Sequence, residues 1–408
     1  MGLSVLLALL ACEVGLRVAG YSPTYINPMG SFHDADPVCG HRGRPNIDVR
    51  FASKEFDVRI VHDAIGFRRL ESPRPSASDA RRVCVFGDSF VWGWGVEQGE
   101  CYADQLQARL RDRRIENFGV NNVGTVAEYE LFASECRDRL KPGDVVLLTF
   151  CTNDFLDNVT GSRHAEVRDG QVVLLPANSH LRPSWKRTCQ QGSYLFNYLS
   201  FVINRYQLER RYRRESQQTN VASLASAAQE HAAQAANVSP PESSHQPAPT
   251  AATVAVQAPP AQAAAAPAAE VAKSPVAAAE TTKPKSDLEA QVIVTRHFLE
   301  KWKRDCEDRG ARFIVAYIPG MIELTESPFA SIEILVQNQK SYREAFFACA
   351  ESLQIETLDL LPGMLAAKRE KRLDRLAYPH DTHWTATGHR VVADIVAQRL
   401  EDTTVAAR

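Results

Sequence analysis

Residues 82–89 read RVCVFGDS, and this stretch decides the expected fold. Its first half is a short apolar run that ends in a Gly-Asp turn, which predicts a buried strand followed by a loop. A second uninterrupted apolar run, VVLLTF at residues 145–150, is typical of a strand covered on both faces of a parallel sheet. Ser89 is therefore expected at the carboxyl end of a buried strand.

Helical patterns alternate with short apolar runs on both sides of these two strands. Further strands are predicted at 115–118, 312–318 and 356–360, with helices at 101–110, 126–140, 288–309, 341–353 and from 384 to about 400. Strands that alternate with helices predict an α/β fold, in which a mainly parallel sheet carries helices on both faces.

The composition changes abruptly after Tyr212. No Phe, Tyr or Trp occurs before Phe298, and residues 217–285 consist largely of Ala, Pro, Gln, Ser and Thr. Such a segment cannot bury enough apolar surface to offset its ordering entropy, so disorder is predicted over 216–286. Since the α/β pattern resumes afterwards, residues 40–215 and 287–403 are expected to form one interrupted domain.

Charge and cysteine content exclude several classes of protein. A net charge of -2 without a basic stripe argues against a nucleic-acid partner. The nine cysteines include no CxxC pair, which argues against a structural zinc site. A disulfide such as Cys39 to Cys189 stays open, because pairing does not follow from spacing.

The first twelve residues contain an apolar run too short to span a bilayer. The run suits the core of a signal peptide, although a basic segment before it is missing. We expect residues 1–21 to be a signal or a membrane anchor. The protein is accordingly expected to be exported, and either membrane-anchored or periplasmic or extracellular. A lipoprotein site at Cys12 and an ordinary buried helix stay open.

Ser89 is the first candidate for chemistry. The carboxyl edge of an open α/β sheet is where such folds bind ligands, so a serine there is placed to act as a nucleophile. The alternative is a helix N-cap, for which serine is also favoured. The sequence contains no G-x-S-x-G elbow, so the common α/β-hydrolase arrangement is not supported.

Two further candidates come from PHDTHWTATGH at residues 379–389. A serine nucleophile needs a base and a carboxylate that orients the base, and His383 and Asp381 supply both types. There are two alternatives. These residues could bind a metal together with His380 and His389, or they could simply cap the helix that follows. No further carboxylate or cysteine cluster accompanies them, so neither a metal nor a cofactor is expected.

Asn153 follows the second buried strand. Its side-chain amide is suited to donate a hydrogen bond to an oxyanion. An Asx turn that closes the strand is the alternative.

Together these motifs resemble the ordered blocks of the SGNH (GDSL-like) hydrolases. The order of the blocks is far more specific than any one of them, and the resemblance covers about 42–400 outside the insertion. The blocks are GDS at 87–89, N-x-G at 117–119 with GT at 124–125, ND at 153–154 and D-x-H-W at 381–384. GFR at 66–68 and VWGWGV at 91–96 resemble membrane-anchored bacterial members.

The resemblance implies a three-layer α/β/α fold with a flavodoxin-like five-stranded sheet. It also implies that Ser89 is the nucleophile, His383 the base and Asp381 its partner, with no cofactor. The oxyanion hole would combine the backbone N–H groups of Ser89 and Asn122 with the amide of Asn153.

Two departures from the family pattern bear on function. Asp381 precedes His383 by two residues instead of three, which resembles the alginate O-acetyltransferase-like branch. Asn122 aligns with the family's oxyanion glycine; asparagine keeps the N–H and tolerates a left-handed backbone, but adds a side chain beside the acyl group.

We therefore expect a serine esterase that hydrolyses acyl esters, in the first place acetyl esters, of a small-molecule or polysaccharide substrate. One alternative is a carbohydrate O-acyltransferase with the same triad, which would need an acyl donor from a membrane acyltransferase partner. Another is a non-catalytic SGNH-fold binding module, which Asn122 favours. The expected contact with the membrane is through the N-terminus.

Overall fold

The computed structural model of the chain describes residues 2–26, 31–76, 80–179, 181, 184–207, 210, 287–320, 323–324, 333–370, 373, 375–379 and 381–406. The segment at 216–286, predicted to be disordered, lies outside the described residues. All elements below belong to one compact unit that includes both sides of this segment.

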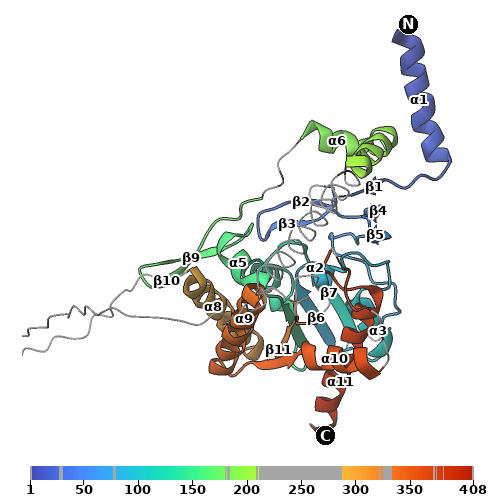
Figure 1. Cartoon of the computed structure of the whole chain (residues 1–408). Helices are drawn as coiled ribbons and strands as arrows, with labels where there is room; N and C mark the ends of the chain where they lie inside the picture. Colours follow the sequence, from blue (N-terminus) through green and yellow to red (C-terminus); the bar gives the residue numbers. More distant parts are fainter. Residues whose placement is uncertain are drawn as a thin grey trace, which may run out of the picture. The chain divides into compact units, whose positions relative to one another are not determined.

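A five-stranded sheet with the order β12-β11-β8-β6-β7 forms the centre of this unit (Figure 1). Every neighbouring pair in this sheet is parallel. The strands are β6 (Arg82–Gly87), β7 (Arg114–Gly119), β8 (Val145–Phe150), β11 (Arg312–Tyr317) and β12 (Glu356–Asp359). The predicted α/β class with a parallel sheet is confirmed. The central strand β8 buries all six of its residues, as its apolar sequence predicts.

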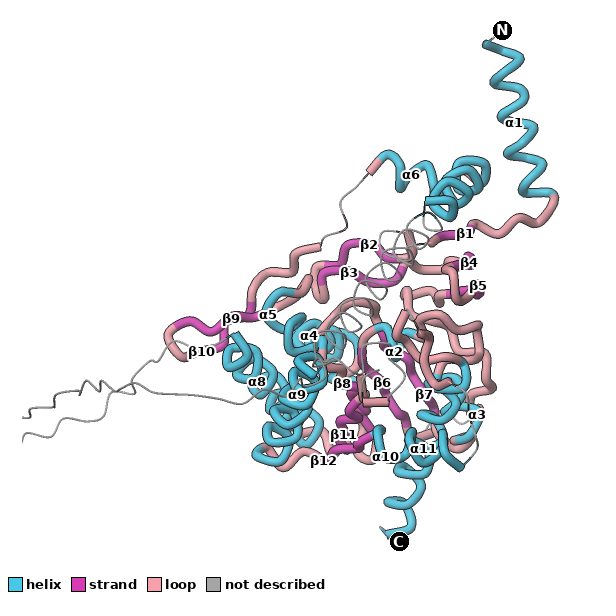
Figure 2. Tube along the Cα trace, in the orientation of Figure 1, coloured by secondary structure: helices cyan, strands magenta, loops and turns pink. Residues whose placement is uncertain are grey.

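Helices cover both faces of the sheet, which gives the three predicted layers (Figure 2). Along β6, Cys84 and Phe86 belong to one core cluster and Val83 and Val85 to the other, as the two-residue period of a strand requires. The first cluster is shared with α4 (Thr125–Glu135), α5 (Asn153–Thr160), α8 (Asp287–Glu307) and α9 (Glu333–Ser352). The second is shared with α3 (Tyr102–Arg109), α10 (Leu360–Glu370) and α11 (Ala386–Ala406).

Smaller elements precede β6. Helix α1 (Gly2–Val18) lies in the segment where a signal or anchor was expected. Five short strands were not expected from the sequence: β1 (Thr24–Tyr25), β2 (His33–Asp36), β3 (Gly40–Gly43), β4 (Asp48–Ala52) and β5 (Asp57–Val61). β1, β4 and β5 form a small sheet, and β2 and β3 form a hairpin. Phe32, Phe51 and Trp92 lie in a third core cluster that joins these strands to the main domain.

Shorter elements complete the unit. They are α2 (Ser89–Trp92), the 3-10 turn Arg137–Arg139, the hairpin of β9 (Ala165–Arg168) and β10 (Gln171–Leu174), α6 (Trp185–Gly192) and a helix at 194–207.

The N-terminal helix α1 has 17 residues. Among the described residues, no helix combines the length and apolar character needed to cross a membrane. All nine cysteines are free, including Cys39 and Cys189, and seven of them are buried.

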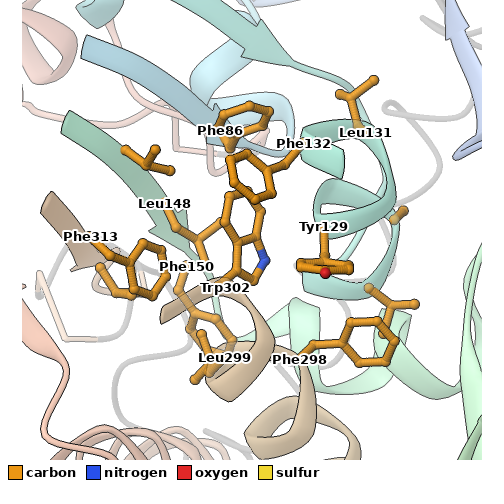
Figure 3. Packing of buried hydrophobic residues seen from close by; sticks show 14 of the residues in the cluster. Phe86, Tyr129, Leu131, Phe132, Leu148, Phe150, Phe298, Leu299, Trp302 and Phe313 are labelled. Carbon is orange, nitrogen blue, oxygen red and sulfur yellow. The ribbon is translucent and has the colours of Figure 1, made fainter. Parts of the chain in front are cut away.

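Trp302 of α8 lies at the centre of the larger core cluster (Figure 3). Its ring centroid is 4.4 Å from that of Phe132, 5.1 Å from that of Phe86 and 5.7 Å from that of Phe313. This residue therefore connects α8, which follows the insertion in sequence, to β6 and α4, which precede it.

We predict that Trp302→Ala lowers the free energy of unfolding by about 3–5 kcal/mol, because it leaves a cavity between α8 and the sheet. Chemical denaturation measures this change. The matched control is Trp185→Ala, at a side chain that is 68% exposed, and it should leave the midpoint nearly unchanged. Equal effects of the two substitutions would show that α8 is not packed as described.

Candidate active site

The turn after β6 presents Ser89 at the carboxyl edge of the sheet. Ser89 is the first residue of α2, and Oδ1 of Asp88 caps this helix by accepting the backbone N–H of Phe90 at 3.0 Å. Gly87 is required just before them, since a Cβ there would lie 2.3 Å from Cγ2 of Val91. The local sequence thus forces a sharp turn that leaves the serine hydroxyl at the edge.

The structure brings together the three residues that the sequence suggests as a triad. The Ser89 hydroxyl oxygen lies 2.7 Å from Nε2 of His383. On the other side of that ring, Nδ1 lies 2.7 Å from Oδ1 of Asp381. When the Nδ1 proton is donated to Asp381, Nε2 is free to accept the serine proton.

Thr382 explains how a carboxylate and a histidine two residues apart can contact each other. Its φ is 73°, in the left-handed region that β-branched residues rarely adopt. The surrounding turn is fixed by two backbone hydrogen bonds: Tyr378 N–H donates to His383 O at 2.8 Å, and Thr382 N–H donates to Tyr378 O at 3.1 Å. Such strain costs roughly 1–3 kcal/mol and persists only where its surroundings enforce it.

Two residues that sequence reasoning missed hold the aspartate. The indole Nε1–H of Trp94 donates to Oδ2 of Asp381 at 3.0 Å, and its ring stacks on the His383 ring at a centroid distance of 4.9 Å. Glu55, between β4 and β5, accepts the backbone N–H of Asp381 at 2.8 Å. The WGWG motif at 92–95 draws attention to Trp94 in the sequence. The motif does not show, however, that this indole contacts Asp381.

Buried Arg68 supports the loop that carries Trp94. Its side chain donates to the carbonyls of Gly93 and Val96 and, at 3.1 Å, to Oε1 of Gln98. Burial lowers the pKa of Arg68, and its positive charge faces backbone carbonyls where a carboxylate would be the usual partner. The GFR motif at 66–68 therefore has a structural role in shaping the site.

A pocket of about 530 Å³ opens at this edge, within the size range of small-ligand sites. It contains the serine and the histidine, with apolar and polar side chains from several segments around them. The lining residues are Asp88, Ser89, Phe90, Trp94, Asn121, Asn122, Cys151, Thr152, Asn153, Pro319, Gly320, Leu324, Gln339, Thr382, His383 and Trp384.

The two asparagines expected at the oxyanion hole both lie on the wall of this pocket. Asn122 is exposed and has a φ of 56°, the left-handed conformation that asparagine tolerates. The amide of Asn153 donates to Oδ2 of Asp88 at 3.3 Å and to Oδ2 of Asp157 at 3.0 Å. Two carboxylates therefore orient this amide beside the serine.

The loop before Asn122 is held from the N-terminal hairpin. Nε2 of His41 in β3 lies 2.6 Å from the carbonyl oxygen of Asn121, to which it donates when protonated. Both residues are buried. Sequence reasoning did not assign a role to His41, since the contact joins segments far apart in the chain.

Asp88 of the pocket lining interacts electrostatically with two further buried carboxyl groups, those of Glu128 and Asp154. Burial raises the pKa of Asp88 to about 6, and it raises the pKa of Glu128 and of Asp154 well above the usual range. Charged forms of these groups are disfavoured by the same burial and by their mutual repulsion.

His389, one of the alternative metal ligands, belongs to the core. Its Nδ1 accepts the backbone N–H of Tyr102 at 3.1 Å, and burial lowers the pKa of its ring to about 3. His380 lies outside the described residues. Within the described part of the chain, no group of three or more His, Cys, Asp or Glu side chains is arranged to hold a metal ion.

Comparison with known families adds to this geometry. The model of the GDSL-like Lipase/Acylhydrolase family matches residues 85–291, which is half of the chain. The chain belongs to this family. A second model, the SGNH hydrolase-like domain of the acetyltransferase AlgX, matches residues 277–408. The class of chemistry is therefore acyl-ester hydrolysis or acetyl transfer.

Solved structures similar to this GDSL-family chain include a lipolytic G-D-S-L protein from Veillonella parvula DSM 2008. The two are 11% identical over 78% of this chain and 97% of that chain, with a TM-score of 0.37. An acetyl xylan esterase from Butyrivibrio proteoclasticus is 10% identical over 84% of this chain and 67% of that chain, with a TM-score of 0.31. No curated protein matches the chain.

We predict that Trp94→Phe lowers turnover about tenfold, because the ring remains while a hydrogen bond to a charged group is lost. Without this hydrogen bond, Asp381 orients the His383 ring less firmly. Steady-state ester hydrolysis tests this, with Trp185→Phe as the control. An unchanged rate would mean that the indole serves packing alone.

Proposed function

We propose that this GDSL-family chain is a serine esterase that removes acyl groups, in the first place acetyl groups, from a carbohydrate-like substrate. The observation that carries the proposal is the continuous contact from Ser89 through His383 to Asp381, with both distances at 2.7 Å. Its position on the wall of a pocket of ligand size adds support.

In the proposed reaction, Nε2 of His383 takes the hydroxyl proton as Oγ of Ser89 attacks the ester carbonyl carbon. The tetrahedral intermediate then collapses, the C–O bond to the alcohol breaks, and the imidazolium returns its proton to the leaving oxygen. Water attacks the resulting acyl-serine with His383 again as base, which releases the carboxylic acid and restores the serine. Asp381 orients the ring and stabilises its positive charge.

The proposed oxyanion hole combines the backbone N–H groups of Ser89 and Asn122 with the amide of Asn153. Its support is that all three residues line one pocket. Because Asp88 and Asp157 already accept from the Asn153 amide, oxyanion binding must compete with one of these hydrogen bonds. The incoming negative charge favours the exchange, since hydrogen bonds to charged acceptors are the stronger ones.

The lining of the pocket supports a small acyl group on a hydroxylated alcohol. Phe90 and Trp94, which are partly exposed, offer apolar surface for an acyl chain. Thr152 and Gln339, also partly exposed, offer hydrogen-bonding groups of the kind that sugar hydroxyls use.

A carbohydrate O-acyltransferase is the second candidate. It is favoured by the two-residue spacing of Asp381 and His383 and by the match of residues 277–408 to the AlgX domain. In that case a sugar hydroxyl replaces water in the second step. A membrane acyltransferase partner would supply the acyl donor. For either candidate, the proposed place of action is outside the cytoplasm, with residues 1–21 as a signal or anchor.

We predict that Ser89→Ala, His383→Ala and Asp381→Ala each reduce turnover of p-nitrophenyl acetate strongly. Losses of about 10⁴ to 10⁶ are typical for triad residues, and the three losses should be far from additive because the residues act as one unit. The control is His297→Ala on α8, which should retain the full rate.

The same assay with acetylated polysaccharide and a sugar acceptor separates the two candidates. Free acetate as the main product supports the esterase, whereas acetyl groups recovered on the acceptor support the transferase. Wild-type protein that is inactive on every ester, with or without an acceptor, would instead favour a binding module.

We further predict that Asn153→Ala lowers the rate about 10² to 10³ fold, because one oxyanion donor is lost. Asn122→Gly should preserve the rate or raise it, since the backbone N–H stays and the side chain no longer crowds the acyl group. Steady-state kinetics on a soluble ester measure both. A loss on Asn122→Gly as large as that on Asn153→Ala would show that Asn122 acts through its side chain.

A further inference from the structure

The helix at 194–207 exposes a stripe of large apolar side chains. Spacings of one, four, five and eight residues place them on one face of the helix. Their exposed fractions lie between 42% and 60%, and they are Tyr198, Leu199, Val202, Ile203 and Tyr206. An isolated exposed leucine needs no explanation, but a contiguous stripe of this kind marks a surface that binds something.

The N-terminal helix α1, at one end of the chain in Figure 1, exposes a second apolar surface. Its large apolar residues are between 50% and 83% exposed: Leu3, Val5, Leu6, Leu7, Leu9, Leu10, Val14 and Val18. A helix that is apolar all round is stable only when something apolar covers it.

Glu13 and Arg17 fix α1 to the start of the helix at 194–207. The Glu13 carboxylate accepts the backbone N–H groups of Leu195 at 2.9 Å and Tyr194 at 3.0 Å, so it caps this helix from another segment. These hydrogen bonds lower the pKa of Glu13 to about 2. Arg17 bonds to Glu13 at 2.8 Å and lies 4.2 Å above the Tyr194 ring. The two apolar surfaces are therefore neighbours held by charge-assisted contacts.

We propose that α1 and the helix at 194–207 form one surface that binds an anionic lipid membrane. This inference adds a second, surface-lying helix to the expected N-terminal attachment, and it does not depend on the proposed reaction. We call the residues 198, 199, 202, 203 and 206 the apolar stripe.

Aromatic and basic side chains around the stripe identify a lipid surface as the occupant. Tyrosines lie at both ends of the stripe, and the neighbouring Trp185 is 68% exposed. Tyr and Trp favour the boundary between headgroups and acyl chains. Exposed Arg205 lies within the span of the stripe, just before Tyr206, and exposed Arg210 follows it. Apolar residues beside exposed arginines are typical of helices that lie on anionic membranes.

The helix at 194–207 is fastened to the catalytic unit. Oδ1 of its Asn197 accepts the Tyr21 hydroxyl and the backbone N–H of Thr24 in β1, each at 2.8 Å. In α6, Arg187 donates to Asp34 of β2 at 2.5 Å. A membrane bound by this helix would therefore hold the active site in a defined orientation.

The test is co-sedimentation of the full chain with vesicles of phosphatidylcholine alone and of phosphatidylcholine with phosphatidylglycerol. The variant Val202→Asp with Ile203→Asp places two charges in the apolar stripe at exposed positions, where folding should not suffer. We expect wild type to prefer the anionic vesicles and the variant to bind at least about tenfold more weakly, since two apolar contacts are lost.

Ile65→Asp is the matched control, because Ile65 is 50% exposed and lies outside both helices. It should bind vesicles as wild type does, and all variants should keep the wild-type rate on a soluble ester. Equal vesicle binding by the stripe variant and wild type would overturn the proposal. So would a wild-type dimer in sedimentation velocity that the stripe variant abolishes, since the occupant would then be a second copy.

Discussion

The parallel pairing of β8 with both β6 and β11 is the constraint on which the rest of the structure depends. β6 precedes the segment at 216–286 and β11 follows it, so this pairing unites the two halves of the chain in one sheet. Parallel strands end at a common edge, and the residues after each strand meet there. Ser89 follows β6, Asn153 follows β8 and Pro319 follows β11, and all three line the pocket. The pocket forms at this edge because β6, β8 and β11 all run in the same direction.

The turn that carries Asp381 and His383 depends equally on residues that precede Ser89 in the sequence. Arg68 holds the carbonyls of the loop that carries Trp94, and Trp94 in turn contacts Asp381. Glu55 holds the backbone of the same aspartate from the small N-terminal sheet. This support explains how a strained Thr382 can persist, because several contacts outside its own segment enforce the turn. The N-terminal strands are therefore part of the active-site framework.

The sequence predicted the central sheet well, because β6, β8 and β11 contain uninterrupted apolar runs and the helices between the strands have a clear period. It also predicted that Ser89, Asp381 and His383 lie together, and their side chains are in contact. The strands between residues 24 and 61 were missed, since all five are only two to five residues long and four of them carry charged residues. The left-handed Thr382 and the contact of Trp94 depend on tertiary packing, which no local pattern encodes. The role expected of Asn122 in an oxyanion hole came from the family resemblance, since the spacing of the residues alone does not imply it.

The burial of the cysteines has a consequence for the route by which the chain reaches its folded state. The thiolate is the form that reacts with oxidants, and burial raises the pKa of Cys39 to about 12 and that of Cys101 to about 11. Once folded, the chain keeps these sulfurs unreactive. Before folding, all nine thiols are accessible to one another. In an oxidising compartment, folding must therefore outpace disulfide formation, and slow folding would trap the chain in mispaired, cross-linked forms.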